Sequence, residues 1–115
     1  MIKKPNDCKI DLREQMRGGN GTVVLTQLLT PEEMYGKNRL FSKITLNPGC
    51  SIGYHEHHGE SEIFFVISGE GIFNDNGIES EVFAGEVLVT SSGSGHSISC
   101  KGSVPLELVA LIVLE

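Results

Sequence analysis

The stretch GCSIGYHEHHGESEIFFVISG, residues 49–69, decides how the rest of the chain is interpreted. It holds three of the protein's four histidines within four residues, between a glycine turn and a strongly apolar run, with Glu62 close behind. This arrangement is not expected of a solvated loop. It is expected of a metal site inside a β-barrel, because such a site combines nitrogen ligands and a carboxylate with apolar surroundings.

The size and composition of the chain predict a single globular domain over residues 1–115. The chain is 39% hydrophobic and 21% charged, which is ordinary for a globular protein of this length. No signal peptide is expected, and the longest apolar run, residues 106–114, is too short for a membrane helix and is interrupted by Glu107. Three cysteines do not form a disulfide framework, so we expect free thiols and a cytoplasmic location.

The charges are divided unevenly along the chain. The net charge of −6 argues against nucleic acid and anionic membranes as partners. Residues 1–43 hold all but one of the basic residues and are net positive, whereas the remainder is strongly acidic. If the interior binds an anion through side chains, these come from a second subunit or from Arg13, Arg17, Arg39 or Lys43. The alternative is that the basic residues lie by chance on an exposed arm.

Short strands separated by turns account for most of the chain. Residues 1–21 are predicted to form a polar arm that ends in the loop sequence RGGNG, and residues 22–115 to form a barrel. The predicted strands cover residues 22–29, 39–46, 62–68, both halves of a hairpin at 71–83, and residues 86–90, 96–100 and 106–114. About eight to ten such strands with no convincing helix predict an all-β sandwich or barrel with Greek-key or jelly-roll connections.

Two connections have recognisable turn chemistry. Thr30 is a possible helix N-cap and Pro31 suits the first helical position, which predicts at most one helical turn before Gly36. Asn76 and Gly77 form the preferred pair for a two-residue hairpin turn of type I′.

The last predicted strand bears on assembly, because both of its faces are apolar. One face can line the barrel, and the other must also be covered. We therefore predict a homodimer in which a second subunit covers the outer face. The two faces consist of Leu106, Leu108, Ala110, Ile112 and Leu114 on one side and Val109, Leu111 and Val113 on the other.

Four side chains in this pattern can meet at one metal ion. His55 and His57 are two residues apart, so on a strand they point to the same side. Glu62 opens the next strand after a short connection, and His96 arrives from much later in the chain, as a jelly roll permits. Three neutral imidazoles and a carboxylate form a mixed nitrogen and oxygen site for a first-row divalent metal, with room left for water or a ligand.

The spacing of these residues resembles the first of two motifs that mark the cupins, a family of small metal-binding jelly-roll barrels. That motif has a glycine, five residues, His-x-His, three or four residues, a glutamate, six residues and a second glycine. The corresponding positions are Gly49, His55, His57, Glu62 and Gly69, and every spacing is met.

The second cupin motif is matched in part. It has a glycine, five residues, Pro-x-Gly, two residues, a histidine, three residues and an asparagine. Gly85, Gly93 and His96 fall in register, while Ser91 replaces the usual proline and Cys100 the usual asparagine. These two departures lie at turn and strand positions and leave the ligand position intact.

The resemblance implies a jelly-roll barrel similar to small single-domain bacterial cupins of the oxalate-decarboxylase-like group. It also implies one divalent transition metal per chain, with manganese or iron favoured and nickel, zinc or cobalt possible. The metal ligands of the family fall on His55, His57, Glu62 and His96.

Neighbouring residues have other expected roles. His58 has the wrong parity for the site and is expected at the surface, and Glu56 is expected to point into solvent. Glu60 lies two residues before Glu62, so on a strand it would point to the same side, and it is the alternative carboxylate ligand. Cys100 is expected to point into the barrel, either as a small buried hydrophobe or as a redox-sensitive group near the metal.

Three hypotheses of function follow from the site. A divalent metal on three imidazoles and one carboxylate keeps a net positive charge, so we expect a small anionic or oxygen-rich ligand. The first hypothesis is a metal-dependent lyase or decarboxylase, dioxygenase or isomerase, whose acid–base group is unassigned among Glu56, Glu60 and Glu70. The second is a metal-dependent binding or sensing module without catalysis. The third is a structural metal that only stabilises the barrel.

Overall fold

Ten β-strands and no α-helix make up the structure, a computed structural model that describes all residues 1–115. This confirms the predicted all-β fold. Single 3-10 turns occur at η1 (Pro5–Asp7), η2 (Met16–Gly18) and η3 (Glu32–Met34). The strands are β1 (Ile10–Glu14), β2 (Thr22–Leu29), β3 (Asn38–Leu46), β4 (Ser51–Glu56), β5 (Glu60–Ser68), β6 (Glu70–Asp75), β7 (Ile78–Phe83), β8 (Val87–Thr90), β9 (Gly95–Lys101) and β10 (Leu106–Leu114).

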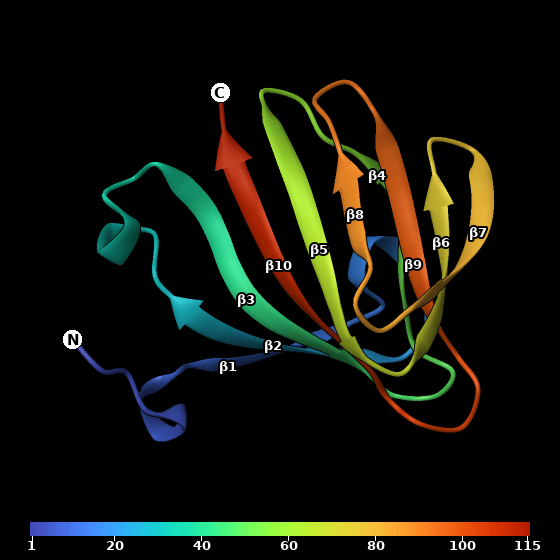
Figure 1. The fold of residues 1–115 in the computed structure, drawn as a ribbon. Coiled ribbons are helices and arrows are strands. Elements are labelled where there is room, and N and C mark those ends of the chain that lie inside the picture. The colour runs from blue at the N-terminus through green and yellow to red at the C-terminus, as the bar shows by residue number, and fades with distance from the viewer.

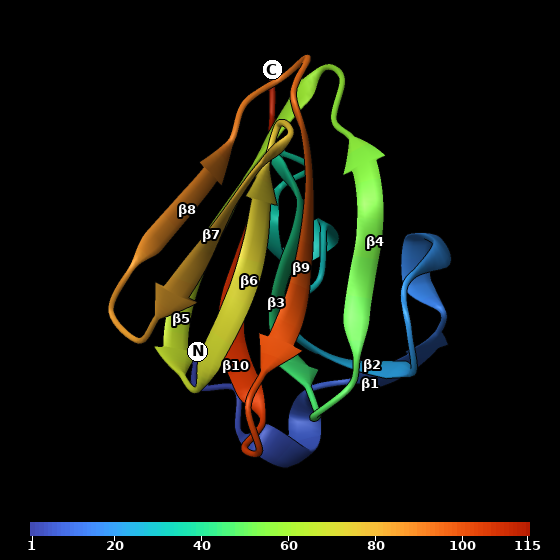
Figure 2. The same cartoon turned by 90° about the vertical axis from the view of Figure 1, so that its right-hand side faces the viewer.

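The strands form two antiparallel sheets that face each other (Figure 1, Figure 2). The larger sheet has the order β1-β2-β3-β10-β5-β8, and the smaller sheet has the order β4-β9-β6-β7. Strands remote in sequence are therefore neighbours, since β10 lies between β3 and β5, and β9 lies between β4 and β6. These crossings between the sheets are those of a jelly roll, and they bring His96 next to residues far earlier in the chain.

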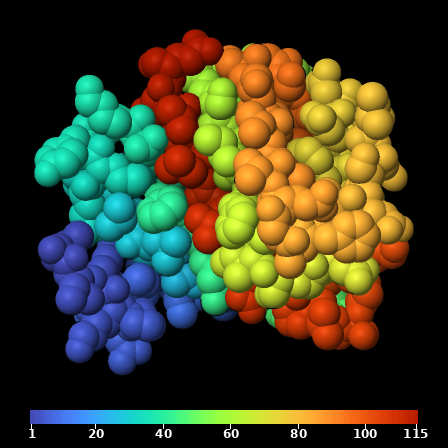
Figure 3. All heavy atoms as spheres, viewed as in Figure 1, coloured from blue at the N-terminus to red at the C-terminus, as the bar shows by residue number.

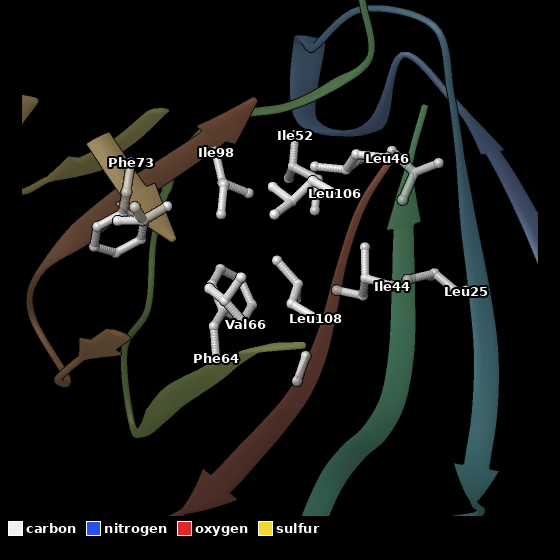
Figure 4. Packing of buried hydrophobic residues seen from close by; sticks show 13 residues of the cluster. Leu25, Ile44, Leu46, Ile52, Phe64, Val66, Phe73, Ile98, Leu106 and Leu108 are labelled. Carbon is white, nitrogen blue, oxygen red and sulfur yellow. The ribbon is translucent and has the colours of Figure 1, made fainter. Parts of the chain in front are cut away.

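The core lies between the two sheets, and the alternation of side chains along each strand supplies it. In Figure 4, Phe73 and Ile98 of the smaller sheet point toward Phe64 of the larger sheet, and the rings of Phe64 and Phe73 meet edge to face at 6.3 Å. Leu114 departs from the predicted inner face of β10 and is 39% exposed, because it is the last residue of the strand. The rest of that face is buried, as predicted, and consists of Leu106, Leu108, Ala110 and Ile112.

Two local turns form as the sequence predicts. Asn76 and Gly77 close the β6–β7 hairpin with φ angles of 51° and 103°, both positive as a type I′ turn requires. Before η3, the Thr30 N–H donates to the Glu33 carboxylate at 2.8 Å, and the Glu33 N–H donates to the Thr30 hydroxyl at 3.2 Å. This reciprocal capping pair starts a single helical turn, which ends before Gly36.

The arm of residues 1–21 contains a strand that the sequence analysis did not predict. β1 pairs with β2 along its whole length and adds an edge strand to the larger sheet. Its apolar residues Ile10 and Leu12 both remain exposed. The strand therefore depends on backbone hydrogen bonds to β2 rather than on a buried face, and a hydrophobic pattern could not reveal it.

After β1 the arm turns at η2 and packs on β4, the edge strand of the smaller sheet (Figure 2). The Ser51 N–H donates to the Asn20 carbonyl at 2.8 Å, and the Asn20 N–H donates to the Ser51 hydroxyl at 2.8 Å. Two glycines let the backbones touch, because a Cβ on Gly19 would overlap the Ser51 carbonyl and one on Gly53 would overlap the Arg17 carbonyl. The arm thus belongs to one sheet through β1 and is bound to the other through η2.

We expect Gly19→Ala to destabilise the protein by about 1–3 kcal/mol, because the added methyl group overlaps the Ser51 carbonyl and overpacking has that usual cost. Urea unfolding followed by circular dichroism measures the change. Asn20→Ala is the control, since this side chain is exposed, and it should alter the free energy of unfolding by less than about 0.5 kcal/mol. A Gly19→Ala variant as stable as the wild type would contradict the close contact.

Candidate metal centre

The four predicted ligands meet at one point between the two sheets. His55 in β4 and His96 in β9 are partners across an antiparallel strand pair of the smaller sheet. Glu62 reaches them from β5 in the larger sheet, and His57 lies just beyond the end of β4. One ligand atom from each of the four residues lies within 4.8 Å of the others.

The loop between β8 and β9 holds His57 in place. The His57 N–H donates to the Ser94 carbonyl at 3.0 Å, and the His57 carbonyl accepts from the Gly93 N–H at 2.6 Å. The loop closes on itself through the Ser94 N–H, which donates to the Ser91 carbonyl at 3.0 Å. The turn therefore forms with serine at position 91, where proline is usual in the motif.

The ligand atoms are closely spaced and buried. The Nε2 atom of His96 is 3.1 Å from that of His57 and 3.3 Å from that of His55. The Oε1 atom of Glu62 is 3.0 Å from the Nε2 atoms of both His57 and His96. These three residues are at most 6% exposed, so water cannot easily solvate the polar atoms.

The Nδ1 atoms of the same rings point away from the cluster. His55 Nδ1 donates to the Gly53 carbonyl at 2.8 Å, and His57 Nδ1 donates to the Glu60 carboxylate at 2.6 Å. Because a carbonyl and a carboxylate can only accept, the proton of each ring sits on Nδ1. In the neutral rings, the Nε2 lone pairs therefore face the centre of the cluster.

The cluster consequently has the donor set of a metal site. Nitrogen lone pairs and a carboxylate oxygen face one another at hydrogen-bond distance, and only a cation or added protons can relieve their repulsion. His96 Nδ1 is 2.7 Å from the Thr90 hydroxyl, so all three rings have a partner that orients them, as metal-binding histidines usually do. The four residues are compatible with one divalent metal.

The electrostatic surroundings differ among the rings. The pKa of His57 is raised, first because Glu62 accepts a hydrogen bond from Nε2 when the ring is protonated and, against the effect of burial, by the contact of Nδ1 with Glu60. Burial lowers the pKa of His55, which keeps that ring neutral, as ligation requires. Positive charge near His57 and Glu62 is therefore electrostatically favourable, and a metal cation would supply it.

Glu60, the rival ligand in the sequence, contacts the far side of the His57 ring instead of the cluster. Its two carboxylate oxygens accept from Arg39 Nε at 2.9 Å and Nη2 at 2.8 Å. The Arg39 guanidinium, followed by the His57 hydrogen bond, lowers the pKa of Glu60 to about 2. Arg39 and Glu60 therefore form a charged pair that orients the His57 ring.

A cavity of about 450 Å³ opens beside the cluster and is lined by all four of its residues. Apolar side chains from both sheets form much of the wall, among them Leu25, Ile44 and Ile98. Protein cavities of this size commonly hold small molecules. The cluster is therefore accessible to a ligand from one side while the core covers the other.

Three of the four basic residues considered for anion binding line this cavity. Arg13 and Arg17 come from the arm, and Arg39 comes from β3. Lys43 is not part of the lining, and instead forms an ion pair of 3.2 Å with Glu107. Two basic residues of the arm, Arg13 and Arg17, thus place positive charge beside the site, while its three lysines lie outside the cavity.

Other singled-out residues lie away from the cluster. His58 and Glu56 are 71% and 58% exposed and form a loose pair at 3.6 Å, as expected of surface residues. Cys100 packs against the core but is not part of the cavity lining, and its thiol donates to the Val104 carbonyl at 3.2 Å. This placement fits the small buried hydrophobe and does not support a group near the metal.

The sequence analysis missed two residues of the site. Thr90 is buried beside His96 and is the cross-strand partner of Glu62, so strand parity could have placed it inside. Glu14 lines the cavity from the end of β1. No signal marked Glu14, because the strand that carries it has no buried apolar face.

Comparison with known proteins connects the fold and the cluster to one family. The family model for the cupin domain matches residues 42–113. The chain belongs to the cupin family. This cupin is also 42% identical over 114 residues to the oxalate-binding protein of Thermotoga maritima, covering 99% of this chain and 94% of that protein.

Solved structures agree with the assignment. A crystal structure from Thermotoga maritima, described as a predicted oxalate decarboxylase, matches this cupin with a TM-score of 0.96 at 42% identity and covers 100% of both chains. The cupin domain of Schizosaccharomyces pombe Cnp3 matches with a TM-score of 0.75 at 13% identity, over 93% of this chain and 70% of that one. At that identity the likeness shows the fold alone. The resemblance to cupins inferred from the two motifs is confirmed.

We expect Glu60→Gln to weaken Mn²⁺ binding by about 10–100-fold, because loss of a carboxylate behind a ligating imidazole usually has that effect. Calorimetric titration of the metal-free protein measures the affinity. Glu56→Gln removes the same charge from an exposed position nearby and should leave the affinity unchanged within about twofold. Equal affinities for all three proteins would contradict the orienting role of Glu60.

Proposed function

We propose that this cupin binds one divalent transition metal per chain through His55, His57, Glu62 and His96, and that the metal in turn binds a small anionic ligand. The observation that carries the proposal is the cluster itself, whose ligand atoms lie within 4.8 Å of one another. Manganese or iron is our first choice, while nickel, cobalt and zinc also suit these donors.

Oxalate, or a related carboxylate, is the ligand we propose. The relative from Thermotoga maritima with 42% identity is named an oxalate-binding protein. Three neutral rings and one carboxylate would leave a divalent metal with a net positive charge, and Arg13 and Arg17 add to it along the cavity. When bound, the metal would supply a Lewis acid that attracts and polarises a carboxylate oxygen. Nucleic acid and anionic membranes remain unsuitable partners for a chain of net charge −6.

Catalysis at the same site is the second candidate, as a lyase or decarboxylase, a dioxygenase or an isomerase. The observation that favours it is Glu14, an acidic residue of the cavity lining whose carboxylate could exchange a proton with a ligand. The groups considered from the sequence are less suitable. Glu56 and Glu70 are exposed outside the cavity, and Glu60 is bound to Arg39.

We also propose that each chain is one domain of residues 1–115 and that two chains form a dimer in the cytoplasm. Figure 3 shows the outer face of the larger sheet. Exposed apolar residues lie there on neighbouring strands. Phe65, Val87 and Val89 are 46%, 60% and 52% exposed, and Phe65 pairs with both Val87 and Val109. A second subunit would cover this face. All three cysteines are free, in keeping with a reducing compartment.

Elemental analysis of protein purified without chelator or nickel resin tests the metal site. We expect about one manganese or iron ion per chain in the wild type and in His58→Ala, whose side chain is exposed, and none in His96→Ala. Absence of metal from the wild type, even after metal addition and dialysis, would overturn the proposed function.

The metal-loaded protein is then titrated with oxalate in a calorimeter. Binding that the metal-free protein lacks supports the ligand proposal, and no binding contradicts it. A fall in oxalate concentration during longer incubation would identify catalysis, whereas a constant concentration would identify a binding module.

Light scattering at micromolar concentration tests the dimer. We expect about twice the chain mass of 12.5 kDa, falling to the mass of a single chain in Val89→Glu, because a charge in the centre of an apolar interface cannot be solvated. Val104→Glu, in an exposed loop, should leave the mass of the wild type unchanged. A wild-type mass of one chain would contradict the proposal.

A further inference from the structure

The arm brings two arginine residues to the lining of the cavity beside the cluster. Arg13 lies in β1 and Arg17 in η2, and both line the cavity although both residues are exposed. They therefore stand at its rim, where η2 packs beside β4 (Figure 2).

Neither Arg13 nor Arg17 forms an ion pair with an acidic side chain. Arg39, the third arginine of the lining, is held by both oxygens of Glu60. Arg13 and Arg17 take part in none of the ion pairs of the structure, although Glu14 lines the same cavity. Two unpaired arginines at a cavity rim are suited to bind a carboxylate, because their planar forks match its two oxygens.

The backbone around Arg17 is held in an uncommon conformation. Gln15, Arg17 and Gly18 all have positive φ angles, of 48°, 54° and 81°. Local hydrogen bonds keep this shape, since the Gly18 N–H donates to the Gln15 carbonyl and the Gly19 N–H donates to the Met16 carbonyl, both at 2.9 Å. Left-handed backbone at residues other than glycine costs free energy and is found where a ligand group must be positioned.

The wall between the cluster and the rim is largely apolar. Leu12 and Met16 of the arm line it together with Leu40 and Ile52 of the sheets. The volume of about 450 Å³ is far more than oxalate needs, because its two carboxylates are joined by a single bond. A ligand that fills the cavity would therefore have an anionic group at each end and carbon atoms between them.

We propose that Arg13 and Arg17 form a second anion subsite, which binds the far carboxylate of a dicarboxylate longer than oxalate while its near carboxylate binds at the metal cluster. This rests on the proposed metal-dependent function and narrows its ligand class. The two arginines determine specificity, because they distinguish a diacid from a monoacid of equal length, whereas the apolar wall selects the length of the chain.

Calorimetry of the full-length Mn²⁺-loaded protein tests the subsite, with succinate and glutarate compared with the monoacids butyrate and valerate. We expect at least one diacid to bind about tenfold or more tightly than its matched monoacid, since hydrogen bonds to charged groups contribute that much. The double variant Arg13→Gln/Arg17→Gln should lose this preference, because its affinity for the diacid should fall about tenfold more than its affinity for the monoacid or for oxalate.

Matched variants separate this effect from general electrostatics. Lys37→Gln removes one charge from an exposed position outside the cavity and should behave as the wild type. Arg13→Lys/Arg17→Lys keeps the charge and should restore part of the diacid preference. Circular dichroism confirms that each variant folds.

The possible results distinguish the two proposals. Failure of the wild type to take up Mn²⁺ would overturn the proposed function and the subsite together. Two results would overturn the subsite alone, provided that the wild type takes up Mn²⁺ and binds oxalate. The first is that the wild type prefers no diacid to its matched monoacid. The second is that the double variant loses equal affinity for the diacid and the monoacid.

Discussion

Three imidazole nitrogens and a carboxylate oxygen converge between the sheets, and much of the structure serves to hold these mutually repelling groups together. His55 and His96 come from the smaller sheet and Glu62 from the larger one, with the Glu62 oxygen 3.0 Å from the nearest ring nitrogens. The two sheets must therefore keep their separation and register at this point. The core supplies that rigidity, because the Phe64 ring stacks on the His96 ring at 5.1 Å and also packs edge to face against the Phe73 ring.

The hydrogen bonds on the outer side of the three imidazole rings orient the ligand nitrogens. A carbonyl, a carboxylate and a hydroxyl engage the three Nδ1 atoms, so that the opposite nitrogens face the same point. The carboxylate behind His57 belongs to Glu60, which Arg39 holds from the neighbouring part of the larger sheet. A chain of hydrogen bonds thus connects a surface arginine to the centre of the cluster, and each ring is oriented before any ligand arrives.

The arm gives the cavity its chemical asymmetry. One end of the cavity has the donor cluster, the wall is apolar, and the rim carries Arg13 and Arg17. This arrangement depends on close contact of backbones where Gly19 meets β4, because any larger residue there would push the arm and its arginines away from the opening. Three of the basic residues scattered over residues 1–43, Arg13, Arg17 and Arg39, are therefore brought to one cavity by the fold.

Local chemistry in the sequence determined the strand pattern and the available donors. Runs of β-branched and apolar residues predicted the bounds of β2 and β10, and the Asn76-Gly77 pair predicted a hairpin. The spacing of His55, His57 and Glu62 indicated a common site. The alternation of side chains along a strand could not tell Glu60 from Glu62, because Arg39, which holds Glu60, is remote in the chain. It could not reveal β1 either, because that strand is held by backbone pairing with β2. Only the tertiary structure decided which donors face the cluster, since the register of distant strands is set by packing across the core and not by neighbours in sequence.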